Sequence, residues 1–433
     1  MDTSRIRELL GFYENELVRN VLFFWDEKCL DAENGGFLNC FDNTGENLIS
    51  KDKYTWSLGR FVWLFARLAD MECGTLTKAE RAKYLAWAGQ GADFLMAHSL
   101  VAPGVWRCAF LLDETGAPKT VEGWGERLDL SLAADSFVVS GLARYAKSAN
   151  REDCYVFAKA LYLSAKERYK RNDFVNLPYP LGEKYRAHGG PMIFLNAGTE
   201  LYGAAQIFDT VFTNEIKTQL RGFAEEILYT FTDENHCVRE VIAADGSYLP
   251  SLLGQHMNPG HTIECMWFLT DAMDIFDEPK WLKRIATIAW KALECGWDED
   301  YGGLLHYCGL DGGAPKGDDV SSNENEPMTK HVLDGWADKL WWVHSEALYT
   351  TLLLYARTED ELFWEWHRRV FAYTFDKFPN PNREVREWIQ ILQRDGTPQE
   401  KVVALPVKDP YHIARNLLLI IELLHAMLHG ENS

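Results

Sequence analysis

The stretch Gly302-Gly-Leu-Leu-His-Tyr-Cys-Gly-Leu-Asp-Gly312 reads as a short strand that ends in an Asp-Gly turn. Similar strand-and-turn stretches occur four more times, at residues 31–45, 106–116, 237–246 and 387–396. The glycines that close the five turns lie 71, 130, 66 and 84 residues apart, and the interval of 130 is close to two units of 65. An internal period near 70 residues is therefore the main architectural signal in this sequence.

Helical patterns fill the intervals between these turns. Apolar residues recur at near-helical spacing over residues 3–29, and further helices are expected at about 54–68 and 78–97. Each interval leaves room for two helices, so about six helix pairs fit into the 433 residues. The sequence therefore predicts an all-α fold, an (α/α)6 barrel or toroid of six helix pairs, with short β-hairpins rimming a pocket at one end.

The alternative arrangement is an open solenoid, which needs polar helices at its two ends. The last helical run, residues 416–428, is instead very apolar, which favours a closed ring. This run is too short and too interrupted to span a bilayer, so it reads as a buried helix. No interdomain linker is evident, and residues 1–433 are expected to form a single domain. The polar stretch 311–329 is expected to be a loop at the pocket rim.

Composition narrows the function classes. A hydrophobic content of 47% and an aromatic content of 13% support a large buried core. The formal charge of −20 argues against nucleic acid or an anionic membrane as a partner. The nine cysteines lack metal-ligand spacing, and the N-terminus does not resemble a signal peptide. These features predict a cytoplasmic protein with reduced thiols.

Residues 258–264 read Asn-Pro-Gly-His-Thr-Ile-Glu, which predicts the start of a helix. Asn258 is a good cap, and Pro259 suits the first helical position. His261 then falls at the third position, and Glu264 lies one turn later on the same face. The positive end of the helix dipole favours the neutral imidazole that a general base needs.

The same pattern returns at residues 409–415, Asp-Pro-Tyr-His-Ile-Ala-Arg. Asp409 is the expected cap, His412 falls at the third helical position, and Arg415 lies one turn on. Two histidines at equivalent helix starts can face one cavity from different helices, which predicts a two-histidine proton-transfer site. The alternative is that each histidine only caps its helix.

Four further residues are candidates for the pocket. Arg60 lies among aromatic residues on an expected helix, where it would hold a ligand oxygen or pair with a buried carboxylate. Glu240 lies on a hairpin strand whose alternation can point it into the pocket. Trp342 and Glu346, at i and i+4 of a helix, can stack on a sugar and bind its hydroxyls. The alternative for each is a buried ion pair or a core aromatic.

Several chemistries have no counterpart in the sequence. It contains no phosphate-binding glycine loop, no Cys/His metal cluster and no Gly-x-Ser-x-Gly motif. The pattern therefore favours an acid–base enzyme that requires neither a cofactor nor a metal.

The motifs resemble those of the N-acylglucosamine 2-epimerase family, which includes the renin-binding protein, cellobiose 2-epimerases and isomerases for mannose and sulfoquinovose. The resemblance covers nearly the whole chain. Its most specific pieces are the stretches 258–264, 339–347 (Lys-Leu-Trp-Trp-Val-His-Ser-Glu-Ala) and 412–415 (His-Ile-Ala-Arg). It implies an (α/α)6 barrel, a small-molecule sugar as partner and often a homodimer.

The resemblance also implies roles for individual residues. His261 and His412 would match the two catalytic histidines, and Arg60 would match the arginine that holds the sugar's carbonyl oxygen. Glu264, Glu346 and Arg415 would match further pocket residues. ATP activates many members of the N-acylglucosamine branch, which makes ATP an expected activator here.

Within the family, the chain is most similar to the N-acylglucosamine branch. Ile193 stands where cellobiose epimerases and the isomerases carry a third pocket histidine, and Lys184 would match a pocket lysine of the N-acylglucosamine branch. The chain departs from the family pattern at Arg386, where a glycine is usual, and at Ala414, where a proline is usual. These departures bear on the substrate more than on the chemistry.

The resemblance implies epimerisation at carbon 2 of a reducing sugar, with N-acylglucosamine and N-acylmannosamine as the expected pair. One histidine would remove the carbon-2 proton, Arg60 would stabilise the enolate oxygen, and the other histidine would return a proton to the opposite face. The alternatives are an aldose–ketose isomerase, a cellobiose 2-epimerase, a glycoside hydrolase that uses carboxylates such as Glu240, Glu264 and Glu346, or a non-catalytic binding protein.

Overall fold

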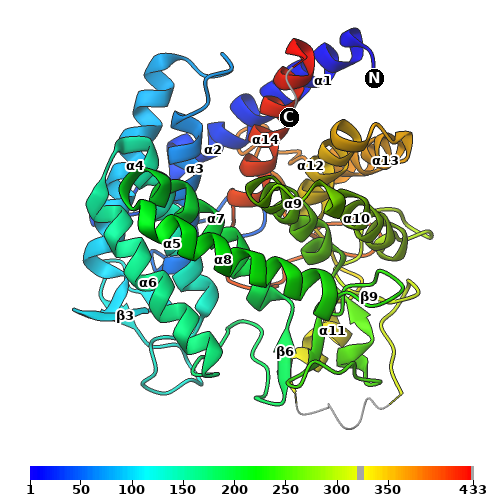
Figure 1. Ribbon diagram of the computed structural model, residues 1–433. Coiled ribbons are helices and arrows are strands. Elements are labelled where there is room, and N and C mark those ends of the chain that lie inside the picture. Colours follow the sequence, from blue (N-terminus) through cyan, green and yellow to red (C-terminus); the bar gives the residue numbers. More distant parts are fainter. Residues whose placement is uncertain (319–325, 431–433) are drawn as a thin grey trace.

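A computed structural model describes residues 1–318 and 326–430 of the chain (Figure 1). Six helices line a central ring: α3 (Thr55–Ala69), α5 (Leu132–Ala149), α7 (Gly189–Phe208), α9 (Pro259–Phe276), α12 (Trp341–Thr358) and α14 (Tyr411–His429). Each of them packs on the next, and α14 packs on α3. The ring is therefore closed, which confirms the toroid and excludes the open solenoid.

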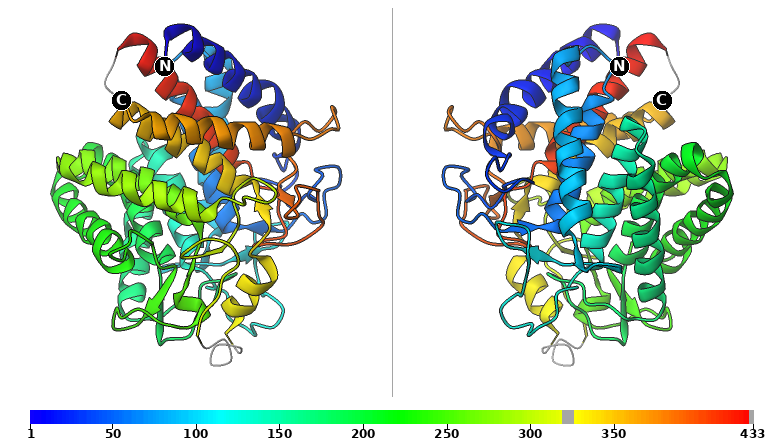
Figure 2. Two further views of the ribbon diagram at one scale, coloured as in Figure 1. Left: turned by 90° about the vertical axis from the view of Figure 1, so that its right-hand side faces the viewer. Right: turned by 90° about the vertical axis from the view of Figure 1, so that its left-hand side faces the viewer.

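An outer helix backs each helix of the ring. These outer helices are α4 (Lys78–His98), α6 (Glu152–Lys170), α8 (Thr210–Glu226), α10 (Leu282–Gly296), α13 (Glu361–Lys377) and, behind α14, α1 (Thr3–Asn15) with α2 (Leu22–Lys28). A π-helical segment, Glu16–Val21, joins α1 to α2, and a second one, Ile227–Phe231, extends α8. The first and last helices of the chain lie side by side (Figures 1 and 2). The sixth pair thus joins the two ends of the described chain.

Short antiparallel strands accompany the helices. They form one three-stranded sheet, β1 (Lys53–Tyr54), β4 (Leu111–Leu112) and β5 (Pro118–Lys119), and four pairs: β2 (Leu100–Ala102) with β3 (Val105–Cys108), β6 (Tyr185–Ala187) with β7 (Val241–Ala243), β8 (His256–Met257) with β9 (Cys308–Gly309), and β10 (Lys339–Leu340) with β11 (Ile391–Leu392). The five turn glycines that define the sequence period all have a positive φ, between +77° and +94°. This is the backbone conformation that makes glycine the favoured residue there.

The strands fix where the ring helices begin. β1, β8 and β10 lead into α3, α9 and α12 within one residue, and β6 leads into α7 after His188. The strands thereby hold the N-terminal ends of these ring helices at one end of the molecule. This end carries the hairpins, as the sequence period predicts.

Close helix contacts tighten the ring between α3 and α5. A β-carbon added at Gly59 would lie 2.4 Å from the backbone of Phe137, and one added at Gly141 would lie 2.4 Å from the carbonyl oxygen of Gly59. Only glycine permits this approach. The contact places Arg60, the next residue of α3, against the ring of Phe137, with 4.0 Å between the guanidinium carbon and the ring centre.

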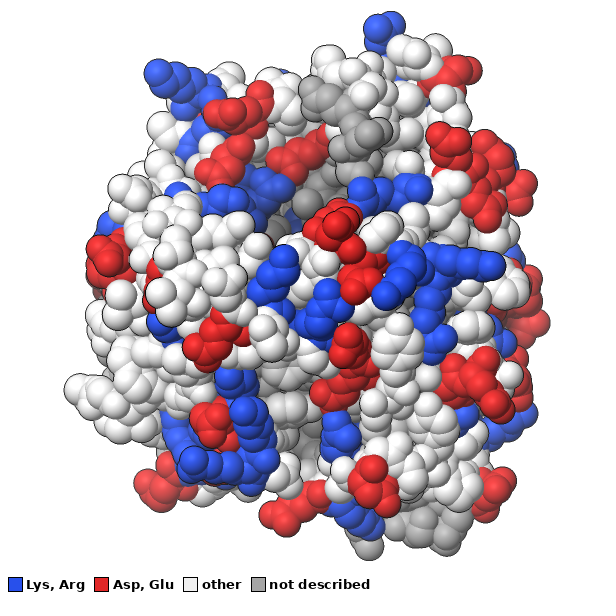
Figure 3. Space-filling model, in the orientation of Figure 1, with Lys and Arg blue, Asp and Glu red and all other residues white. Residues whose placement is uncertain are grey.

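The structure also bears on the predictions for the rim loop, the apolar last helix and the cysteines. Residues 327–329 of the expected rim loop belong to helix α11 (Pro327–Gly335), while residues 319–325 lie outside the described residues. Helix α14 is long and apolar enough to cross a membrane by composition, but most of it is buried inside the ring. All nine cysteines are free thiols. Acidic and basic side chains are interspersed on the face shown in Figure 3.

Candidate active site

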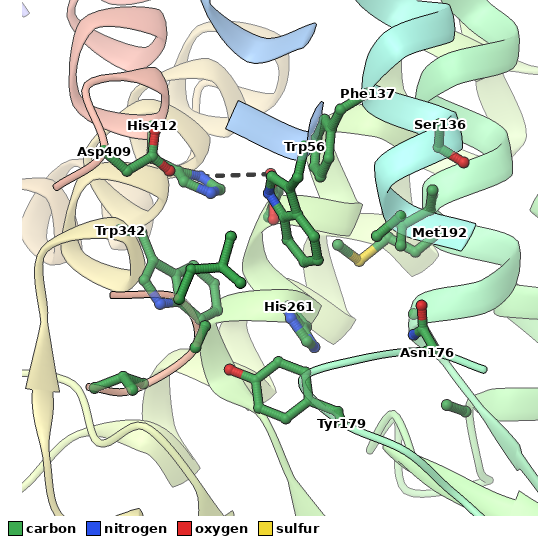
Figure 4. Close-up of a pocket in the computed structure, with 18 of the residues that line it drawn as sticks. Trp56, Ser136, Phe137, Asn176, Tyr179, Met192, His261, Trp342, Asp409 and His412 are labelled. Carbon is green, nitrogen blue, oxygen red and sulfur yellow. Dashed lines mark ion pairs between the residues drawn. The ribbon is translucent and has the colours of Figure 1, made fainter. Parts of the chain in front are cut away.

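A cavity of about 160 Å³ opens where the ring helices begin. Its walls carry side chains from α3, α5, α7, α9 and α12, and from the start of α14. Figure 4 shows His261 and His412 beside this space, with Trp342 near both and with Met192 and Asn176 across from them. The two predicted histidines therefore face one cavity from different helices.

His261 is held by two separate contacts. Its backbone N–H donates to the side chain of Asn258 (3.0 Å), which caps α9 as predicted. Its ring Nδ1 lies 2.9 Å from Oε1 of Glu240, a residue just before β7. A carboxylate accepts the Nδ1 proton, so Nε2 of His261 is the nitrogen left for the cavity. The side chain of His261 keeps 24% of its surface exposed.

The neighbouring carboxylates shift the pKa of His261 upward, opposite to the downward shift that the helix dipole favours. Burial lowers the pKa of His261, but the charge and hydrogen bond of Glu240 and the charge of Glu264 outweigh it and raise that pKa above its usual value. Burial likewise opposes ionisation of Glu240, yet the charges of His261 and His188 hold the pKa of its carboxyl well below the usual range. A carboxylate 2.9 Å away outweighs the partial charge of the helix end.

His412 has its own carboxylate. Its Nδ1 lies 2.7 Å from Oε1 of Glu346, which also accepts from Asn416 (2.7 Å) and Arg415 (2.5 Å). The other oxygen of Glu346 accepts from the indole of Trp267 (2.9 Å). Burial raises the pKa of Glu346, but the charge of Arg415 and the bond to His412 lower it to well below its usual value. The Nδ1 proton of His412 is thus held, as in His261, by an ionised carboxylate.

Arg60 lies on the cavity side of His412. Its guanidinium donates to Oδ2 of Asp409 (2.5 Å) and lies 3.2 Å from Nε2 of His412. The other oxygen of Asp409 accepts from the N–H of Tyr411 (2.9 Å). The cap of α14 is Pro410, so the predicted cap at Asp409 lies one residue too early and His412 occupies the second helical position. Because a guanidinium can only donate, Nε2 of His412 is an acceptor in this arrangement. Arg60 therefore lies beside His412, and both line the same cavity as His261.

Trp342 forms the wall next to both histidines. Its ring centre lies 5.3 Å from that of His261 and 5.6 Å from that of His412. This position depends on Gly260, because an added β-carbon there would lie 2.5 Å from two atoms of the Trp342 indole and 2.7 Å from Val343. Gly260 thus lets the start of α9 approach α12.

Substitution Gly260→Ala is expected to destabilise the protein by about 1–3 kcal/mol, because the new methyl group overlaps the indole of Trp342. The measurement is thermal or denaturant unfolding. Trp342→Phe removes both clashing atoms, so the double variant is expected to regain stability lost in Gly260→Ala. Gly203→Ala is the matched control, because its β-carbon would meet open space on α7. Equal losses in Gly260→Ala and Gly203→Ala would contradict the proposed clash.

The other predicted residues have different surroundings. Glu240, Glu264 and Trp342 line the cavity with the histidines and Arg60. Glu346 and Arg415 do not line it; they are buried behind His412. Glu264 lies one helical turn from His261 and accepts from Arg415, whereas the carboxylate that bonds the ring of His261 is Glu240.

Lys184 does not belong to this site. Its side chain is exposed at the end of β6, and its ammonium lies over the ring of Tyr185 at 5.0 Å. Its carbonyl oxygen accepts from Ala244, which extends the β6–β7 ladder. The ladder fixes the backbone at Lys184 and leaves its exposed side chain outside the cavity, so the predicted pocket lysine does not line this cavity.

Glu264, Glu346 and His412 approach one another closely enough to share a metal ion, with ligand atoms within 4.8 Å. The guanidinium of Arg415 already supplies positive charge there, because it donates to both carboxylates. Burial lowers the pKa of Arg415, but Glu346, Tyr411 and Glu264 raise it far above its usual value. The positive charge between these two carboxylates is therefore the guanidinium of Arg415, a side chain of the protein itself.

Some lining residues escaped the sequence prediction. Asp409 was expected only as a cap, yet its carboxylate instead holds Arg60. Asn176 and Tyr179 come from the irregular segment between α6 and β6, and Trp56 and Met192 come from α3 and α7. The aromatic residues around Arg60 were a signal for Trp56, whereas nothing local marks Asn176 or Tyr179.

Comparisons with known proteins agree with this architecture. Residues 35–415 match the family model described as N-acylglucosamine 2-epimerase. The chain is 28% identical to N-acylglucosamine 2-epimerase of Rattus norvegicus, over 94% of this chain and 90% of the relative, and 29% identical to that of Bos taurus, over 98% and 93%. Its fold is similar to the structure of cellobiose 2-epimerase from Spirochaeta thermophila, with a TM-score of 0.76, 18% identity and coverage of 98% and 99%.

Proposed function

Because this chain belongs to the N-acylglucosamine 2-epimerase family, and is thus a carbohydrate epimerase, we propose that it interconverts N-acylglucosamine and N-acylmannosamine. The observation that carries the proposal is the pair of histidines on one cavity, each with its Nδ1 held by a carboxylate. Inversion at one carbon needs a proton removed from one face and returned to the other, and two separate imidazoles suit that task.

The proposed reaction begins with the open-chain aldehyde form of the sugar. Nε2 of one histidine removes the proton from carbon 2. The guanidinium of Arg60, 3.2 Å from Nε2 of His412, binds the carbonyl oxygen as it becomes an enolate oxygen. The other histidine then delivers a proton to the opposite face. The reverse direction exchanges the roles of His261 and His412.

The carboxylates give this chemistry its geometry. Glu240 and Glu346 hold the Nδ1 protons, so each Nε2 faces the cavity with its ring orientation fixed. Trp342 and Glu264 supply a stacking surface and a hydroxyl-binding carboxylate on the same wall. Activation by ATP, a homodimer and a cytoplasmic location stay predictions from the sequence.

The test is proton NMR in heavy water with N-acetylmannosamine, N-acetylglucosamine, mannose and cellobiose supplied separately. Deuterium at carbon 2 with interconversion of the two N-acetyl sugars is the expected result. Fructose formed from mannose, or an epimerised disaccharide, without reaction of the N-acetyl sugars would overturn the proposed substrate. The absence of exchange with all four sugars would overturn the proposed substrate class.

Glu240→Gln is expected to lower the pKa of His261, because the carboxylate that raises it is gone. When His261 acts as the base, kcat/KM rises as the imidazole loses its proton, so the acid limb of the pH profile should move to lower pH. The amide also disturbs the Nδ1–H tautomer, a change that costs up to about 10⁴-fold in a Ser-His-Asp triad. Profiles measured in both directions check this; an acid limb that stays in place would contradict the coupling.

A further inference from the structure

The ladder between β6 and β7 brings a third histidine to the carboxylate of Glu240. Ala187 pairs with Val241 at the end of the ladder, and the next pair outward is His188 with Glu240, whose backbones share a hydrogen bond of 2.9 Å from N to O. His188 is fully buried at the start of α7, and Glu240 is almost fully buried. Residues 52 positions apart in sequence are therefore held face to face.

The two side chains leave matching groups without partners. Oε1 of Glu240 bonds His261, but its buried Oε2 has no hydrogen bond within the described residues. Neither ring nitrogen of His188 has one within residues 1–318 and 326–430. Nδ1 of His188 and Oε2 of Glu240 lie 3.8 Å apart, about 0.9 Å beyond an ordinary hydrogen bond. Buried polar groups without partners cost free energy, so closing this gap is favourable.

We propose that His188 is a positioning residue, which donates from Nδ1 to the free oxygen of Glu240 and so fixes the carboxylate that orients His261. The role rests on the proposed function, in which His261 exchanges a proton with the substrate. His188 does not line the cavity and acts only through Glu240. The resulting series His188–Glu240–His261 links α7, β7 and α9.

Other titratable groups surround this series. His256, Tyr179 and Tyr307 lie near Glu240; burial lowers the pKa of the first and raises the pKa of the other two, so all three are neutral near pH 7. Glu226, ion-paired with Arg186, acts on His188 from α8, and Glu264 acts on His261 from α9. The two imidazoles next to the carboxylate of Glu240 are therefore those of His261 and His188.

These contacts set the direction in which His188 shifts the pKa of His261 and the pH profile. A donor to Oε2 draws charge away from Oε1 and weakens the hold of Glu240 on the proton of His261. Removing that donor in His188→Leu is expected to raise the pKa of His261 and to move the acid limb of kcat/KM to higher pH. The turnover number is expected to fall about 10- to 100-fold, which is the loss typical of removing an outer partner that helps to orient a functional histidine.

The experiment compares His188→Leu with His188→Asn, whose amide can donate in place of Nδ1. The asparagine variant is expected to stay close to the wild type in kcat and in pH profile. His367→Leu is the control, because it removes an equally buried imidazole that bonds Tyr13 away from the cavity. It is expected to lower stability without moving the acid limb. In the Glu240→Gln background, His188→Leu should cause little further loss.

A readout without turnover separates this proposal from the proposed function. NMR titration of the ¹⁵N-labelled histidines reports the pKa of His261 directly, even in a protein that turns over none of the sugars tested. An upward shift in His188→Leu, absent in His188→Asn and His367→Leu, supports the positioning role. An unmoved His261 pKa in folded His188→Leu, or losses that add fully to those of Glu240→Gln, would overturn it.

Discussion

In heavy water, the His261→Asn protein is expected to exchange the carbon-2 hydrogen of one N-acyl sugar but not of its epimer, and His412→Asn should show the opposite preference. Each variant keeps one imidazole with an intact carboxylate, Glu346 or Glu240, and so keeps the base for one face of carbon 2. Interconversion needs both, and should fall by about 10³-fold in either variant. Proton NMR of each sugar, supplied pure, measures exchange and interconversion together.

His425→Asn serves as the control for this experiment. His425 lies on α14 with His412 but points toward Glu14 on α1, away from the cavity. It is expected to leave both rates unchanged. Exchange of both epimers by both active-site variants would indicate a single-base mechanism, and full interconversion by either variant would remove that histidine from the reaction.

Substitution Arg415→Met is expected to destabilise the protein by about 3–5 kcal/mol, because it leaves Glu264 and Glu346 as buried charges without their cation. The carboxylate beside His412 is then expected to take up a proton, so epimerisation should be lost along with stability. Denaturant unfolding gives the stability, and the NMR assay gives the activity.

Two comparisons test the cause of this loss. Arg369→Met breaks an exposed pair with Glu299 and should cost less than about 1 kcal/mol. Adding Glu264→Gln to Arg415→Met removes one of the stranded charges and should recover part of the stability. A loss in Arg415→Met no larger than that in Arg369→Met would show that the buried pairs contribute little.

The ring was predictable because its signals repeat. Five turns that close with a glycine, each with a positive φ at that glycine, mark the helix pairs, and the apolar run of α14 indicates closure. The start of α9 was predictable because capping is local: Asn258 accepts from the backbone N–H of His261. The start of α14 was predicted one residue early, because its cap is Pro410 and not Asp409. Both histidines nevertheless line the cavity, because each lies in the first turn of its helix.

The partners of those histidines could not be read from the sequence. Helical spacing places Glu264 next to His261, but Glu264 bonds Arg415 of α14, 151 residues away, while His261 bonds Glu240 from a strand. Lys184 and His188 lie four residues apart in one segment, and only the register of β6 on β7 shows which is exposed and which faces Glu240. Such pairings depend on how distant elements meet, which one sequence does not record.

The position of α14 has a consequence for synthesis on the ribosome. This helix is translated after the other helices of the ring, yet it packs between α3 and α12 and carries His412 and Arg415. A nascent chain that stops before residue 411 has an open seam between those neighbours, and Glu264 and Glu346 lack the guanidinium that neutralises them. Completion of the ring and completion of the site are therefore one step, so premature termination before this helix produces a protein without the second imidazole rather than a partly active enzyme.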